Sequence, residues 1–310
     1  MSFQPKRVLL TGGAGFIGSH LARAWEREGV EVVVLDSLRT GSEKNLEGLK
    51  CRFVRGDVRD VALLREAMEG CEAVHHLAAM VSVPESMENP REAEEINAGG
   101  TLAVLDAAKG AGVRKVVLSS TCAVYGFAER LEHRETDLPE PASPYAISKL
   151  TAEHYMKLYN DEFGVPTVAL RYFNVYGPGQ DPNSAYAAAV AAFASRARAN
   201  QPLTIYGDGE QTRDFVFVED VVRANIAAAR GEASGLFNVG CGEQLTINRL
   251  ARQIVEACDS RSKIEHAPPR AGDVRHSRAN IDRTRGELGW EPTVSVAEGL
   301  RATIESFAAG

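Results

Sequence analysis

A tyrosine and a lysine four residues apart are candidates for proton transfer. Tyr145 and Lys149 lie in SPYAISK (residues 143–149), where Ser143 is a favourable N-cap and Pro144 suits the first helical position. Their spacing puts both side chains on one helix face. A neighbouring ammonium and the helix N-terminus favour a phenolate, so the pair could exchange protons near neutral pH. The same spacing also occurs on ordinary solvated helices, so this interpretation requires a hydride carrier beside the pair.

A glycine-rich turn near the N-terminus predicts a site for such a carrier. Residues 7–10 are apolar and lead into TGGAGFIG (residues 11–18), which a helical stretch follows. In a strand–turn–helix unit, the backbone can approach a pyrophosphate closely and the helix N-terminus offers it unpaired N–H groups. The spacing is G-x-x-G-x-x-G, and a glycine triplet can also be an ordinary turn. The predicted cofactor contacts are Gly12, Gly15, Phe16, Ile17 and Gly18.

An acidic residue at the end of the next strand favours NAD over NADP. The strand expected at residues 31–35 ends on Asp36. A carboxylate there accepts hydrogen bonds from a ribose diol and repels a 2′-phosphate. Arg39 and Lys44 follow and could weaken this preference, although exposed basic residues usually have no such role.

Alternating strands and helices predict an α/β fold with a doubly wound parallel sheet. Strands are expected at residues 52–55, 73–77, 113–118 and 165–170, and helices at 61–69, 90–111 and 186–199. A further strand at residues 236–239 is expected to return to the sheet. The smaller lobe is therefore discontinuous: residues 1–174 and 215–245 would bind NAD, and residues 175–214 and 246–310 would form the second lobe.

Several candidates lie where strands end, at the sheet edge that binds ligands in such folds. Asp57 and Val58 follow the third strand and could contact the adenine, although Asp57 could equally be a turn residue. Leu77, Ala78 and Ala79 follow the fourth strand, where small residues would let a cofactor lie against the backbone. His75 and His76 are interpreted as structural.

Composition excludes several other classes of function. The 310-residue chain has 35 Lys and Arg against 42 Asp and Glu, without a basic run, so nucleic acid is an unexpected partner. Its five cysteines are widely spaced and lack a C-x-x-C, which indicates neither zinc nor a disulfide framework. No apolar run approaches the ~20 residues that span a bilayer. We expect a cytoplasmic protein with no metal and no membrane partner.

Four stretches in chain order resemble the extended short-chain dehydrogenase/reductase superfamily, and within it the nucleotide-sugar 4-epimerases. They are TGGAGFIG (11–18), SSTCAVYG (119–126), SPYAISK (143–149) and RYFNVYGPGQ (171–180), and the resemblance covers essentially the whole chain. The resemblance implies a Rossmann domain with a smaller mixed α/β substrate lobe, NAD as cofactor and a UDP-sugar as substrate. The implied reaction is 4-epimerisation of UDP-hexoses through a transient 4-keto sugar.

The resemblance also implies residue roles. Tyr145 would be the acid/base, Lys149 would bind the nicotinamide ribose and lower the tyrosine pKa, and Thr121 would hydrogen-bond the reacting hydroxyl. Asn97 would keep these parts in register. Ser119 and Tyr172 complete the predicted cofactor site. The predicted substrate contacts are Val81, Ser82, Asn174, Arg213, Arg270, Asp273 and Ser277, of which the two arginines would meet the phosphates and Ser277 would lie beside the sugar.

Departures from the family pattern bear on the substrate. Related dehydratases and decarboxylases carry an acid just after the catalytic hydroxyl residue, where this chain has Cys122 and Ala123, so epimerisation is favoured. A lysine typical of galactose-type epimerases is replaced in the stretch MVSVP (80–84), and this stretch looks like the branch that handles N-acetylated hexosamines. A UDP-uronate 4-epimerase, a nucleotide-ketosugar reductase and a non-catalytic regulator are the alternatives.

The predicted helix after Ser143 has two apolar faces. Ala152, Tyr155, Met156 and Tyr159 lie on one face, and Ile147, Leu150 and Leu158 on the other. One face would pack on the sheet and the other on a partner. We therefore expect a homodimer, joined through helices near residues 97–108 and 146–159.

Overall fold

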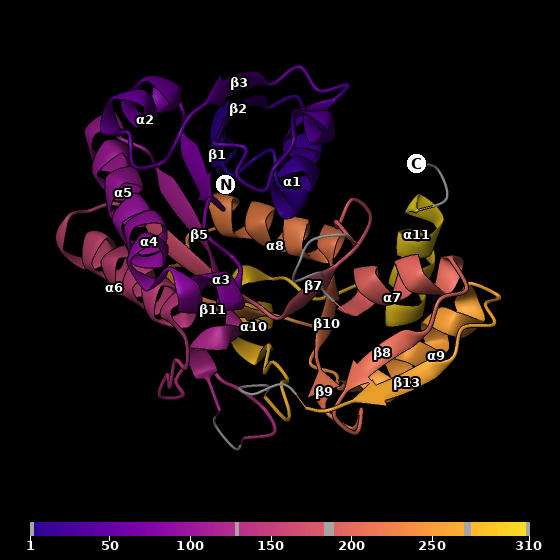
Figure 1. The fold of residues 1–310 in the computed structure, drawn as a ribbon. Helices are drawn as coiled ribbons and strands as arrows, with labels where there is room; N and C mark the ends of the chain where they lie inside the picture. Colours follow the sequence, from indigo (N-terminus) through magenta and orange to yellow (C-terminus); the bar gives the residue numbers. More distant parts are fainter. Residues whose placement is uncertain (1–2, 128–129, 183–188, 270–273, 308–310) are drawn as a thin grey trace.

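A seven-stranded sheet is the centre of the computed structural model, which describes residues 3–127, 130–182, 189–269 and 274–307 (Figure 1). Its strand order is β11-β6-β5-β4-β1-β2-β3, and every neighbouring pair is parallel. The strands are β1 (Arg7–Thr11), β2 (Glu31–Asp36), β3 (Arg52–Arg55), β4 (Ala73–His76), β5 (Lys115–Thr121), β6 (Thr167–Tyr172) and β11 (Gly235–Val239). The predicted doubly wound Rossmann sheet, including the return of the late strand, is confirmed.

Helices cover both faces of this sheet (Figure 1). Successive side chains of β1 alternate: Val8 and Leu10 pack with one apolar cluster, and Leu9 packs with the other, as expected for a strand buried on both faces. The first cluster includes α1 (Phe16–Arg27) and α8 (Val218–Arg230). The second includes α2 (Val61–Met68), α5 (Gly100–Ala111) and α6 (Pro144–Glu162).

The helix predicted at residues 90–111 is continuous but not uniform. It consists of α4 (Pro90–Glu94), a π-helical segment (Glu95–Gly99) and α5. A π-helical turn adds a residue to the helical repeat and often occurs at functional sites. Here the π segment carries the buried Asn97, a candidate site residue.

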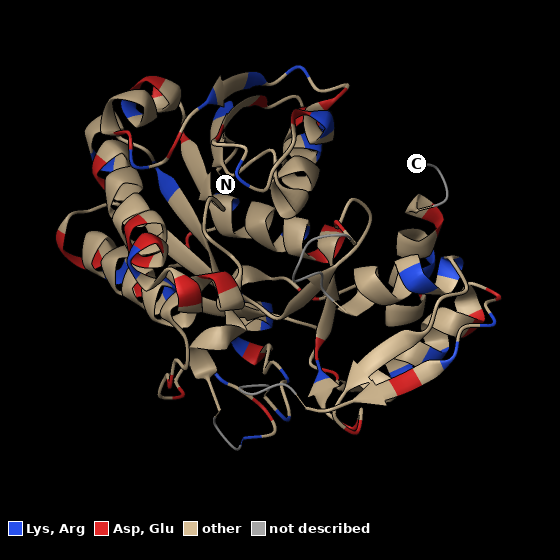
Figure 2. Ribbon diagram, viewed as in Figure 1, with Lys and Arg blue, Asp and Glu red and all other residues tan. Residues whose placement is uncertain are grey.

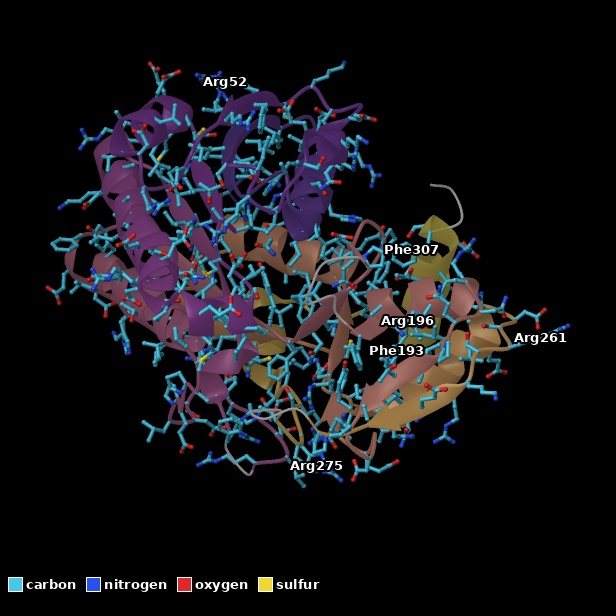
Figure 3. The ribbon with its side chains drawn as sticks, viewed as in Figure 1. Arg52, Phe193, Arg196, Arg261, Arg275 and Phe307 are labelled. Atoms are coloured by element: carbon cyan, nitrogen blue, oxygen red, sulfur yellow. The ribbon has the colours of Figure 1, made fainter. Side chains whose placement is uncertain are left out.

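A smaller lobe has its own apolar core, which unites segments far apart in the chain. Phe193 of α7 (Ala189–Arg198), labelled in Figure 3, packs in this core with side chains of α9 (Ile247–Ala257) and α11 (Val296–Ser306). β8 (Leu203–Tyr206) pairs in parallel with β13 (Ile264–Ala267). Only the part of the predicted 186–199 helix from Ala189 onward lies within the described residues.

Short elements connect the lobe to the sheet. β7 (Asn174–Tyr176) pairs in parallel with β10 (Phe215–Phe217), and β9 (Thr212–Arg213) pairs antiparallel with β12 (Leu245–Thr246). α10 (Asp282–Leu288) packs against β11, although it falls in the range predicted for the second lobe. We retain the predicted domain division as a proposal, which the membership of β11 in the large sheet supports.

The remaining short helices are η1 (Glu43–Leu46), α3 (Val83–Glu88) and η3 (Cys122–Tyr125). Lys and Arg are interspersed with Asp and Glu along the ribbon (Figure 2). None of the helices in the described part of the chain is long and apolar enough to cross a membrane.

Candidate active site

The glycine turn between β1 and α1 forms a tight backbone cradle. Gly12 has φ +72°, and a Cβ on it would lie 2.6 Å from the backbone N of Ala78. A Cβ on Gly18 would lie 2.3 Å from the backbone O of Gly12. α1 begins at Phe16 behind Gly15, with no side-chain N-cap hydrogen bond and no acidic residue in its first turn. The helix N-terminus therefore keeps its donors and its partial positive charge for an anion, which fits the pyrophosphate of a dinucleotide.

Asp36 ends β2 with its carboxylate fixed beside this turn. Its Oδ2 accepts a hydrogen bond from the N–H of Ala14 at 2.9 Å, and its Oδ1 accepts one from the N–H of Leu38 at 2.8 Å. The residue is buried. Since carboxylate oxygens have further lone pairs, Asp36 can also accept from ribose hydroxyls.

The predicted cofactor contacts after β3 and β4 differ in their burial and in their hydrogen bonds. Asp57 forms two side-chain hydrogen bonds with Arg59, which lower the pKa of its carboxyl group. The Val58 side chain is buried in the sheet core, so its backbone is the part left for an adenine. Leu77 and Ala78 follow β4, and their N–H groups bond to Thr11. Ala79 comes next in the same partly exposed stretch.

Tyr145 lies in the first turn of α6, as predicted. Ser143 caps this helix by accepting from the N–H of Ala146 at 3.2 Å. The side chain of Thr121, at the end of β5, lies near enough to the Tyr145 hydroxyl to lower its pKa. The Tyr145 N–H donates to Ser86 Oγ of α3 at 3.1 Å. The site thus joins a proton-transfer group to a second hydroxyl, from two separate elements.

The predicted lowering of the Tyr145 pKa is not found in the chain by itself. Burial raises the pKa of Tyr145 to about 12, and the nearby Thr121 side chain only partly opposes this rise. Lys149 lies one turn further along α6, but its Nζ donates to the carbonyl of Ser119 at 2.9 Å. Burial lowers the pKa of Lys149 to about 8, opposed by the charge of Glu153.

Asn97 connects two segments next to Tyr145 and Lys149. Its Oδ1 accepts from the N–H of Met80 at 2.8 Å, and its Nδ2 donates to Ser148 Oγ at 2.9 Å. Ser148 Oγ in turn donates to the carbonyl of Tyr145 at 2.9 Å. The buried amide therefore connects the loop after β4 to the helix that carries Tyr145 and Lys149, and its positioning role stays a prediction.

Ser119 and Tyr172 lie together next to Lys149. Their hydroxyl groups are 2.9 Å apart, and Asn225 of α8 donates to the Tyr172 oxygen at 2.7 Å. Burial raises the pKa of Tyr172 to about 12. Both hydroxyl groups are already hydrogen-bonded within the protein. They would therefore contact a cofactor mainly through van der Waals packing.

The predicted substrate contacts come from both lobes. Asn174 starts β7, and its Nδ2 donates to the carbonyl of Asp214 at 3.2 Å. Arg213 of β9 donates to the carbonyl of Thr212 at 2.8 Å and acts electrostatically on Cys122, near the catalytic candidates. Arg270 and Asp273 lie outside the described residues.

Ser277 is brought to the end of β5 by its neighbours. The bond between Thr212 Oγ1 and His276 Nδ1, 2.9 Å long, ties its segment to β9. Arg275, at the lower edge in Figure 3, is hydrogen-bonded to Asp208 at 2.7 and 2.9 Å. The buried Ser277 then lies near enough to Cys122, the residue next to Thr121, to lower the pKa of its thiol. The two hydroxyl-bearing candidates, far apart in the chain, therefore lie close together.

The two predicted substrate contacts after β4, Val81 and Ser82, differ in exposure and in hydrogen bonding. Val81 is exposed, whereas Ser82 caps α3 by accepting from the N–H of Glu85 at 3.1 Å. Its hydroxyl thus has a structural function as well.

Sequence reasoning missed the buried partners of the site. Ser86 receives the Tyr145 N–H, and Glu153 forms an ion pair with Arg171 behind Lys149. The i,i+4 spacing of Lys149 and Glu153 along one helix could have shown that Glu153 lies near Lys149, but not that it pairs with Arg171. The two histidines that end β4 are buried and hydrogen-bonded: His75 with Trp25, and His76 with Thr101.

The parallel sheet, the glycine cradle at α1 and the Tyr145, Thr121 and Lys149 group define a dinucleotide-dependent enzyme of the Rossmann class. The model of the NAD dependent epimerase/dehydratase family matches residues 8–240, and the chain belongs to this family. The predicted family, enzymatic nature and NAD cofactor are thereby confirmed.

Relatives match almost the whole chain. The UDP-glucose 4-epimerase of Mycolicibacterium smegmatis is 41% identical over 310 residues, 97% of this chain and 98% of the relative. The structure of UDP-glucose 4-epimerase with UDP-glucose from Thermotoga maritima is 38% identical with a TM-score of 0.94, covering 98% of this chain and 99% of that one. A UDP-N-acetylglucosamine 4-epimerase from Methanobrevibacter ruminantium, in complex with UDP-N-acetylmuramic acid, is 37% identical with a TM-score of 0.94, covering 99% of each. These similarities confirm the predicted class of activity, NAD-dependent epimerisation of UDP-sugars.

Proposed function

We propose that this enzyme inverts carbon 4 of UDP-hexoses through a transient 4-keto sugar. The observation that carries the proposal is that the Tyr145 hydroxyl lies near Thr121, which lowers its pKa, one helical turn from the buried Lys149. A phenol beside a second hydroxyl can take a proton from a sugar hydroxyl and return it. The named activities of the relatives support the same reaction.

Each residue has a role in this proposal. Tyr145 removes the proton of the 4-hydroxyl and later gives it back, while Thr121 orients that hydroxyl. NAD, when bound, would supply the hydride acceptor. The ammonium group of Lys149 would act against the burial that raises the tyrosine pKa. Lys149 holds the nicotinamide ribose, and Asn174, Arg213 and Arg270 bind the diphosphate.

The surroundings of Thr121 favour epimerisation over dehydration. The next two residues are Cys122 and Ala123, and burial raises the pKa of the Cys122 thiol to about 11. This thiol keeps its proton at neutral pH, so it is a poor general base for removing a second proton from the sugar. The proposed reaction needs one proton-transfer group only.

We further propose that the pocket accepts N-acetylated hexoses. Ser277 is small and contacts Cys122 beside Thr121, so it leaves more room than a large side chain would. The similarity to an N-acetylglucosamine-type epimerase supports this breadth. Val81, Ser82 and Asp273 complete the proposed substrate site.

The test is an incubation with UDP-galactose, UDP-N-acetylgalactosamine and UDP-galacturonate, each without added reductant. Inversion of the neutral sugars with no net change in nicotinamide absorbance is the expected result. Inversion of the uronate alone would assign a UDP-uronate 4-epimerase. Failure on every sugar, with stoichiometric NADH consumption on a keto substrate, would replace the proposal with a reductase.

We also propose a homodimer in the cytoplasm. Ile147 and Leu158 on the outer face of α6 are 49% and 44% exposed, and α5 packs beside α6. Two copies of this helix pair could bury the apolar face in a four-helix contact. The five free cysteines support a reducing compartment.

A further inference from the structure

Two arginines next to the predicted adenosine contacts, Arg39 and Arg59, form ion pairs with nearby carboxylates. Arg39, in the loop after β2, donates to Glu92 of α4 at 2.6 and 3.1 Å and to Glu85 of α3 at 2.7 Å. Arg59, after β3, pairs with Asp57 of its own loop at 2.7 Å and with Glu95 of the π-helical segment at 3.6 Å. The loops after β2 and β3 and the start of the α3–α4 region therefore meet at one charged cluster.

Arg39 lies at the end of the site where the adenosine ribose is expected. It belongs to the loop that closes around Asp36: a Cβ on Gly41 would lie 3.1 Å from Asp36 Oδ2. Its charge also reaches Asp57, whose carboxyl pKa it helps to lower. Arg39 thus lies near both carboxylates that were predicted to contact the adenosine half of the cofactor.

An arginine at this place in a Rossmann fold is the residue type that accommodates the 2′-phosphate of NADP. The guanidinium fork matches a phosphate by two parallel hydrogen bonds. In this chain both Nη atoms of Arg39 donate to Glu92, and Nη2 also donates to Glu85. The side chain that could have bound NADP is directed to α3 and α4.

We infer that Glu85 and Glu92 are cofactor-selectivity residues, which hold Arg39 against α3 and α4 and so deny NADP a ligand for its 2′-phosphate. Asp36 supplies the first part of the NAD preference, by bonding the ribose diol. Glu85 and Glu92 supply a second part that does not require contact with NAD. The inference concerns the cofactor, so it is independent of which sugar is the substrate.

The charge balance explains why Arg39 does not simply turn toward NADP. If it did, Glu85 and Glu92 would be left unpaired, facing the added negative charge of the phosphate. The four carboxylates of the cluster, Asp57, Glu85, Glu92 and Glu95, outnumber its two guanidinium groups, so the cluster keeps an excess negative charge. The side chains of Arg39, Glu85 and Glu92 are 35%, 32% and 38% exposed, respectively. Ion pairs this exposed add little to folding stability. Their removal should therefore change selectivity without unfolding the chain.

The test measures dissociation constants for NAD and NADP by calorimetry, with no substrate present. Glu85→Gln/Glu92→Gln keeps the side-chain shapes and releases Arg39. We expect NADP to bind on the order of tenfold tighter, the effect of gaining one charge-assisted contact, while NAD changes little. Glu88→Gln, at an exposed carboxylate of the same α3, is the matched control for the general loss of negative charge. A third variant adds Arg39→Ala to the double substitution.

The gain for NADP should disappear in the variant that also lacks Arg39. If the gain persists there, or if Glu88→Gln produces an equal one, the carboxylates act by general repulsion and the inference is wrong. An unchanged NADP affinity in the double variant would also overturn it. Equal losses of NAD and NADP would overturn it as well, because the cluster would then support the fold of the site rather than select the cofactor.

Discussion

Glu153 of α6 and Arg171 of β6 form an ion pair whose side chains are only 2% and 1% exposed. Arg171 donates to both carboxylate oxygens, at 2.9 and 2.6 Å, and Ser120 Oγ donates to one of them at 2.5 Å. Glu153 stands one helical turn beyond Lys149 and raises the pKa of that lysine against the effect of burial. The pair therefore ties the ends of β5 and β6 to the helix that carries the proposed acid/base.

Glu153→Gln should shift the pH profile of the reaction. The pKa of Lys149 is about 8, so the ammonium loses its proton as the pH rises through that value. Removing the carboxylate and leaving the positive Arg171 lowers the lysine pKa further, and His76 of β4, the other titratable neighbour, is kept neutral by burial. We expect the alkaline limb of kcat/KM to move to lower pH.

The same substitution leaves Arg171 buried without its partner, which typically costs ~3–5 kcal/mol of stability. Urea unfolding measures this loss, and Glu162→Gln, on the exposed end of the same helix, is the control. An alkaline limb that stays in place would show that Glu153 has only a structural role.

Tyr145→Phe should retain NAD and lose turnover. The ring still packs, but the proton acceptor is gone, and general acid/base groups typically contribute ~10²- to 10⁴-fold. NAD binding by calorimetry and sugar inversion by NMR give the two readouts, with Tyr155→Phe on the same helix as control. Turnover at the wild-type rate would remove Tyr145 from the proposed mechanism.

Asp36→Ala should weaken NAD and narrow its preference over NADP. The change removes the acceptor for the ribose diol and the repulsion of a 2′-phosphate. Asp36→Asn keeps the shape and loses only the charge, so it should narrow the preference with a smaller loss of NAD affinity. Unchanged dissociation constants for both cofactors would contradict the proposed role of Asp36.

Ser277→Tyr should suppress activity on UDP-N-acetylglucosamine much more than on UDP-glucose. The large ring would occupy room beside Cys122 that only the N-acetylated sugar needs, so the clash acts on one of the two substrates. Ser277→Ala is the control and should leave both activities in place. Equal losses on the two sugars in kcat/KM measurements would show that Ser277 does not gate the pocket.

Ile147→Lys/Leu158→Lys should yield a monomer. Two charges on the outer face of α6 would have to be desolvated in the proposed four-helix contact. Light scattering at micromolar concentration measures the mass, and Leu138→Lys, at a side chain 76% exposed in the loop before α6, is the control. A wild-type monomer under these conditions would refute the proposed homodimer.

The local elements of the site could be predicted from the sequence because their determinants are short-range. The glycine turn before Phe16, the N-cap at Ser143 and the apolar strands each depend on neighbouring residues, through backbone freedom, capping and side-chain alternation. Strand β3 was predicted at residues 52–55 and lies at Arg52–Arg55. Parallel strands bring their carboxyl ends to one edge, so the location of the site also follows from the pattern.

Tertiary structure decided how these elements act on one another. The π-helical turn at Asn97 interrupts an otherwise helical pattern, and its amide is satisfied by Met80 and Ser148 from other segments. The pKa of Tyr145 depends on how deeply packing encloses its hydroxyl, which opposes the lowering that its neighbours suggested. The pairing of Arg39 with Glu85 and Glu92, and of Arg171 with Glu153, likewise joins residues on different elements. A residue's type and spacing thus determine which chemistry it can perform, whereas burial and long-range partners determine its charge state and what remains free to bind a ligand, because both depend on the complete packing of the chain.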